Sequence, residues 1–134
     1  MKLESKSKSA FSGLDVATYR WRLEEVKTRE DALKLLFSVS KLGKCFGFGF
    51  RGYEDMDEHG NEASFKTIDE VEKGREEIEK IDPDTADTYV EVDDGKVSVI
   101  INPFWDNEDG TWMRVRGPEK AAEKVSAAIK KIVE

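Results

Sequence analysis

Apolar and polar residues alternate along several stretches of the chain, and this period of two is the pattern of half-buried β-strands. The first such stretch is Thr18–Val26. Three later stretches, Asp87–Asp93, Lys96–Asn102 and Thr111–Arg116, alternate in the same way, and Asp94-Gly95 between the first two is a strong hairpin signal. The pattern therefore predicts one early strand and, much later in the chain, a three-strand antiparallel meander.

The most unusual alternation lies in Lys44–Tyr53, which reads KCFGFGFRGY. Its three rings would point to one face of a strand, while the other face would carry almost only backbone; the rings are Phe46, Phe48 and Phe50. We interpret this stretch, extended to about Asp55, as the central core strand of the sheet, with a helix laid across the rings. The alternative is that the rings are exposed and stack on nucleic-acid bases. A polar turn and Glu62–Lys66 complete a hairpin with this strand.

Other stretches have the 3.6-residue period of amphipathic helices. Thr28 and Thr67 each stand three residues before an acidic residue, which is the arrangement of a capping box, and they predict helices over Arg29–Leu42 and Ile68–Ile81. Gly74 lies inside the second helix, where glycine costs about 1 kcal/mol relative to alanine. We therefore expect a neighbouring element to pack closely at that glycine.

The dipeptide Gly117-Pro118 predicts the start of a last helix, with proline at its first helical position. The order of elements is then β-α-β-β-α-β-β-β-α. We predict an α+β fold in which a mostly antiparallel sheet of five to six strands and three helices, mainly on one face, form a two-layer sandwich. The C-terminal helix is expected beside the phenylalanine strand. With 134 residues we expect a single domain over residues 14–134, preceded by a lysine- and serine-rich disordered arm over residues 1–13.

Charge and cysteine content narrow the possible functions. The formal net charge of −7 disfavours non-specific binding to nucleic acid, although a local basic face remains compatible with it. Cys45 is the only cysteine, which excludes an intrachain disulfide and a cysteine zinc cluster. The chain shows neither an apolar run of membrane-spanning length nor the pattern of a signal peptide. We therefore expect a cytoplasmic protein that makes no membrane contact.

The sequence offers little catalytic chemistry. His59 is the only histidine, and the glycines miss the spacings of phosphate-binding loops. The stretch Asp55–Gly60 is similar to the start of a calcium loop, but Lys66 stands where the bidentate glutamate is required. We predict a binding domain that is not an enzyme and uses no cofactor or metal. The alternative is a hydrolase or nuclease that holds Mg²⁺ with acidic residues of Asp106–Asp109 and Asp84–Asp87.

Arginines are concentrated in the predicted strands. If helices cover one face of the sheet, the uncovered face would gather these arginines and one tryptophan: Arg20, Arg22, Arg51, Trp112, Arg114 and Arg116. Guanidinium groups beside an aromatic ring suit phosphates, bases and acidic side chains. The pattern predicts a face for an anionic partner, either single-stranded nucleic acid or an acidic protein segment. Two alternatives are cross-strand pairing with Glu24, Glu54 and Glu91, and a homodimer that buries this face.

Two large rings, Phe104 and Trp105, fall in the predicted loop Pro103–Gly110. Aromatic residues are enriched at the centres of protein interfaces, so this loop is a candidate interaction site. The alternative is that the loop folds back and closes one end of the core.

Overall fold

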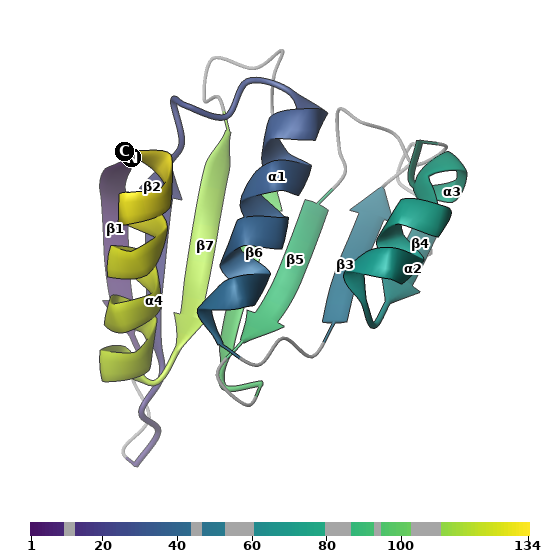
Figure 1. Cartoon of the computed structure of the whole chain (residues 1–134). Helices are drawn as coiled ribbons and strands as arrows, with labels where there is room; N and C mark the ends of the chain where they lie inside the picture. Colours follow the sequence, from purple (N-terminus) through teal and green to yellow (C-terminus); the bar gives the residue numbers. More distant parts are fainter. Residues whose placement is uncertain (10–12, 44–46, 53–60, 80–86, 93–94, 103–110) are drawn as a thin grey trace.

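The structure is a computed structural model of the chain and describes residues 1–9, 13–43, 47–52, 61–79, 87–92, 95–102 and 111–134. Within them, seven strands form one antiparallel sheet in the order β1-β2-β7-β6-β5-β3-β4 (Figure 1). The strands are β1 (Lys2–Lys8), β2 (Ala17–Arg22), β3 (Gly47–Gly52), β4 (Asn61–Phe65), β5 (Asp87–Val92), β6 (Val97–Asn102) and β7 (Trp112–Gly117). The helices are α1 (Arg29–Val39), continued by a 3₁₀ turn over Ser40–Leu42, α2 (Ile68–Lys73), α3 (Arg75–Glu79) and α4 (Glu119–Val133).

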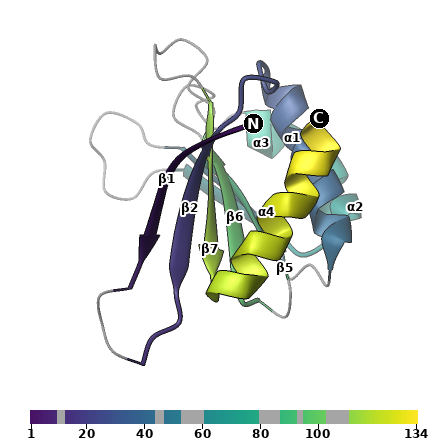
Figure 2. The ribbon, with the colours of Figure 1, turned by 90° about the vertical axis from the view of Figure 1, so that its left-hand side faces the viewer.

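All the helices lie on one face of the sheet, which confirms the predicted α+β architecture (Figure 2). Helix α4 packs on β2, β6 and β7, helix α1 packs on β5, and α2 packs on β4. The core between the layers comes from the alternate strand residues that face the helices, such as Val99 and Ile101, and from the apolar stripe of α1, such as Leu36. The strand and helix counts exceed the prediction because β1 was not expected and the second helix divides at Gly74.

The phenylalanine strand is not central, contrary to the prediction. Strand β3 is second from the edge, because it pairs with β4 on one side and with β5 on the other. Phe48 is a core residue as predicted, with 3% of its surface exposed. The ring of Phe37 packs against it edge-on, with 5.9 Å between the two ring centroids. Phe46 and the side chain of Phe50 lie outside the described residues. The C-terminal helix was also misplaced: it follows β7 directly and packs back onto β7 and its neighbours instead of onto β3.

The N-terminal segment, expected to be a disordered arm over residues 1–13, forms edge strand β1 over Lys2–Lys8. It pairs with β2 from Lys2 opposite Arg22 to Lys8 opposite Ala17, although all seven of its residues are exposed. A strand that buries almost no side chain has no apolar alternation to reveal it in the sequence. Backbone pairing and ion pairs hold it in place instead.

The caps predicted for α1 and α2 are present in the structure, whereas the start of α4 differs by one residue from the prediction. Thr28 and Asp31 form a complete capping box at α1, and the Thr67 hydroxyl accepts a hydrogen bond from the Glu70 amide at 3.2 Å at α2. Gly74 ends α2 and shows the expected close packing, since a Cβ atom there would lie 2.6 Å from Cζ of Phe65. Pro118 is the N-cap of α4 and not its first helical residue, and the Asp15 carboxylate accepts from the Glu119 amide at 3.2 Å.

Candidate functional site

The face of the sheet opposite the helices gathers the predicted arginine surface on β2 and β7. Their antiparallel register places Thr18 opposite Arg116, Arg20 opposite Arg114 and Arg22 opposite Trp112, so three successive rows each contain arginine. The residues between them along β7, Met113 and Val115, are fully buried beneath the helices, and this alternation turns their neighbours outward. We call the outward set the arginine face; it consists of Arg20, Arg22, Trp112, Arg114 and Arg116.

Two contacts within the arginine face show how tightly it is assembled. The guanidinium of Arg20 lies over the ring of Trp112, 4.8 Å from its centroid, which is a cation–π geometry. Arg20 is also directly opposite Arg114 across the two strands. Like charges placed directly opposite one another on a sheet repel, so this arrangement disfavours folding unless an anion compensates for it.

The edge strand supplies one such anion, the carboxylate of Glu4. The β1–β2 register shifts between Leu3 and Ser5, which makes Glu4 the extra residue of a β-bulge. Its Oε1 accepts a hydrogen bond from Nε of Arg22 at 2.8 Å, and its Oε2 lies 3.4 Å from Nε of Arg20. The second contact is an ion pair only, because Nε of Arg20 is buried and makes no hydrogen bond.

Arg114 and Arg116 differ from the pair that Glu4 contacts. Over the described residues, no carboxylate lies within ion-pairing distance of either guanidinium. Nε of Arg114 is buried without a hydrogen-bond partner. An unsatisfied buried donor costs about 1–3 kcal/mol, and more when the group is charged. The centre of the arginine face therefore carries a positive group that the described part of the chain leaves uncompensated.

Beyond β7 the open face becomes less basic. Ser98 of β6 stands opposite Arg116, and exposed Glu91 of β5 stands opposite Ser98, two strands away from the arginine. A shallow pocket with a volume of about 410 Å³ opens at this end and is lined by Arg116, Lys96, Ser98, Glu91 and Asp15, among others. Its lining combines two cations with two carboxylates, so the pocket has no strong preference for either sign of charge.

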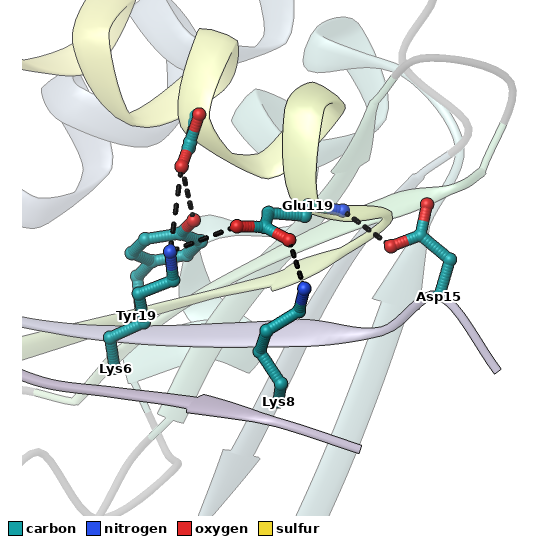
Figure 3. Close-up of polar contacts among 6 residues, drawn as sticks. Lys6, Lys8, Asp15, Tyr19 and Glu119 are labelled. Carbon is teal, nitrogen blue, oxygen red and sulfur yellow. Dashed lines mark hydrogen bonds and ion pairs between the residues drawn. The ribbon is translucent and has the colours of Figure 1, made fainter. Parts of the chain in front are cut away.

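A second charged cluster lies on the other side of β1 and β2, against the start of α4 (Figure 3). Nζ of Lys6 donates to Oε1 of Glu119 at 3.0 Å, Lys8 pairs with the second oxygen of Glu119, and the Tyr19 hydroxyl donates to Glu123 at 2.9 Å. The hydrogen bonds from Lys8 and Lys6 lower the pKa of Glu119, and the bond to Glu119 raises the pKa of Lys6. Each cation of this cluster has a carboxylate partner, and the cluster links edge strand β1 to α4.

The structure brings together four of the five predicted arginines and Trp112. Arg51 belongs to β3, three strands away from β7, and is separate from the arginine face. The predicted pairing with Glu24, Glu54 or Glu91 is not found in the described residues: Glu24 is in an exposed turn, Glu91 is two strands from Arg116, and Glu54 lies outside them. The carboxylate that does pair, Glu4, was missed because its segment was expected to be disordered, and KLESKSK has no apolar alternation that would indicate a strand.

Several candidate residues lie outside the described part of the chain: Cys45, His59, Asp84, Phe104, Trp105 and Asp106–Asp109. Their proposed roles in interaction or metal binding stay predictions. Over the residues that the structure does describe, no group of three or more His, Cys, Asp or Glu side chains converges to hold a metal ion. None of the described helices combines the length and the apolar character needed to cross a membrane.

Comparison with protein-family models, with curated protein sequences and with solved structures finds no significant match to this chain. The fold and the arginine face therefore rest on the chain's own geometry.

Proposed function

We propose that this protein is a non-enzymatic binding domain whose arginine face takes up an anionic partner. The observation that carries this proposal is the uncompensated centre of the face, where Arg114 stands opposite Arg20 and its buried Nε has no hydrogen-bond partner. An incoming carboxylate or phosphate beside these side chains would offset their charge and would relieve the repulsion between the two guanidinium groups.

Three features favour an acidic protein segment as the partner over single-stranded nucleic acid. The Glu4 carboxylate already binds on this face, so carboxylate geometry suits it. The net charge of −7 repels a long polyanion more strongly than a short acidic peptide. In addition, Arg20 already covers one face of Trp112, the ring on which a base would stack. The single cysteine, Cys45, is consistent with a reducing compartment, so we place this binding in the cytoplasm.

The direct test is a fluorescence-anisotropy titration with a labelled glutamate-rich peptide at low salt. We expect wild type to bind, and we expect affinity to fall as salt screens the ion pairs. The double variant Arg114→Glu with Arg116→Glu should lose about tenfold or more in affinity. The matched control is Lys130→Glu with Lys131→Glu, which makes the same change in net charge at two exposed positions near the end of α4.

Circular dichroism must show that both double variants fold, and Arg114→Gln with Arg116→Gln replaces the first pair if it does not. Equal affinity losses in the two pairs would mean that only net charge matters and would overturn the arginine face. A labelled oligothymidylate in the same titration distinguishes the partner classes: tighter binding of the oligonucleotide would move the assignment to nucleic acid. Light scattering after size exclusion examines the homodimer alternative, which requires a dimer that the arginine-face variant dissociates.

A further inference from the structure

The arginine face has a regular spacing that limits which acidic segments can fit it. Along the boundary between β2 and β7, successive rows present Arg116, then Arg20 with Arg114, then Arg22. Rows lie two residues apart on each strand, which is roughly 6.8 Å at the rise of an antiparallel strand. The face is therefore a ladder of three arginine steps with the period of extended chain.

An extended peptide has the same period of two. Its side chains alternate between opposite faces, so only residues at every second position reach the same surface. A segment with acidic residues at alternate positions would present one carboxylate to each step of the ladder. A segment with the same number of consecutive acidic residues would turn at least one of them away from the face.

Glu4 shows where one of these carboxylates would bind. Its side chain already bridges the step of Arg20 and the step of Arg22, so an incoming carboxylate that binds at either of these steps competes with it. The strand that carries Glu4 can yield this position at low cost. Both ion pairs involve partly exposed arginine side chains, at 43% and 37% exposure, and exposed ion pairs contribute little to stability.

Building on the proposed function, we propose that the partner is an extended protein segment with acidic residues at alternate positions, one of which displaces the Glu4 carboxylate. Glu4 is then the internal occupant of one carboxylate subsite. Arg114, whose Nε has no partner within the described residues, shares the middle step with Arg20, and Arg116 forms the step that Glu4 does not reach.

The test compares two labelled peptides of identical composition, Glu-Ser-Glu-Ser-Glu-Ser and Glu-Glu-Glu-Ser-Ser-Ser, on the full chain. We expect the alternating peptide to bind about fivefold more tightly to wild type. Glu4→Gln should bind the alternating peptide about three- to tenfold more tightly than wild type does, because no internal carboxylate competes. The matched control Glu77→Gln removes the same charge from an exposed position on α3 and should leave affinity unchanged.

A second measurement follows the Nε–H resonances of Arg20, Arg22 and Arg114 in wild type during the same titration, and all three should shift together. Equal affinity for the two peptides would overturn the alternating pattern while leaving the arginine face intact. Unchanged or weaker binding by folded Glu4→Gln, or a shift at Arg114 alone, would overturn the displacement of Glu4. Absence of binding by either peptide would instead overturn the proposed function itself.

Discussion

Strands β1 and β2 carry charge on both of their faces, and the two faces differ in whether that charge is balanced. On the helix side, Lys6 and Lys8 meet Glu119 and Glu123 at the start of α4 (Figure 3). On the open side, Glu4 contacts Arg20 and Arg22. No carboxylate of the described residues lies within ion-pairing distance of Arg114 and Arg116, which stand beside them on β7. The balanced cluster has a structural explanation, because it joins an edge strand to a helix. The unbalanced one has none within the described fold, and this difference identifies the candidate binding surface.

The largest expected effect is a difference in stability between substitutions on the two faces of β7. Met113 is fully buried under the helices, so Met113→Ala should lower the free energy of unfolding by about 2–5 kcal/mol. At the neighbouring position, Arg114→Ala should change stability by less than about 1 kcal/mol, because the packing lost with the side chain is offset by removal of the repulsion with Arg20. Chemical denaturation of both variants measures the contrast. Comparable losses would mean that Arg114 is a structural residue and not a binding residue.

The sequence predicted the helix-covered side of the molecule much better than the open side. Alternating Val97, Val99 and Ile101 located a core strand, and Thr28 and Thr67 located two helix starts, because burial and capping each leave a local pattern. Strand order depends instead on pairing between distant segments. For that reason the phenylalanine strand was wrongly placed at the centre of the sheet and α4 was wrongly placed beside it.

The sequence predicted that arginines would gather on the open face of the sheet, but it could not predict which arginines belong there. Arg20, Arg22, Arg114 and Arg116 alternate with buried or half-buried residues, which fixed their face once the helices were assigned to the other side. Arg51 satisfied the same rule and yet stands apart, because three strand spacings separate β3 from β7. Its exclusion required the strand order, and no periodicity within one segment contains that information.

Deleting residues 1–9 tests the charged contacts on both faces of β1 in a single variant. The deletion removes the β1–β2 pairing and the ion pairs to Glu119, so we expect a loss on the order of 1–3 kcal/mol in stability. It also removes Glu4, so affinity for an acidic peptide should rise in the same molecule. Thermal denaturation and anisotropy titration measure the two effects. An unchanged melting temperature would show that β1 contributes nothing to the sheet's stability.

The third effect concerns the start of α4, next to the balanced cluster. Pro118 offers no side-chain cap, and Asp15 accepts the Glu119 amide hydrogen bond in its place. Asp15→Ala should therefore cost about 1 kcal/mol, the usual value of a lost helix cap. Asp15→Asn keeps an acceptor and serves as the control. If the two variants are equally destabilised in urea, the effect comes from charge and not from capping.

The smallest effect is a pH dependence that belongs to the balanced cluster alone. Lys8 and Lys6 lower the pKa of Glu119 in the folded state, so its contribution to stability is present above the ordinary value of 4.5. That contribution is lost as the pH falls below 4.5 and passes through the lower folded pKa. Glu119→Gln should flatten this part of the stability curve. A wild-type curve that coincides with the variant curve between neutral and acidic pH would show that the lysines do not stabilise the carboxylate.

The outer edge of β1 has a further consequence for the behaviour of the protein at high concentration. An edge strand presents backbone donors and acceptors onto which another chain can add a strand, which is how ordered aggregates grow. Here the edge carries Lys2, Lys6 and Lys8, and the bulge at Glu4 interrupts its regular hydrogen-bonding pattern. A second copy approaching this edge meets lysine side chains and an irregular backbone, and both disfavour strand pairing. The same bulge that aims Glu4 at the arginines thus also disfavours the addition of a further strand at this edge.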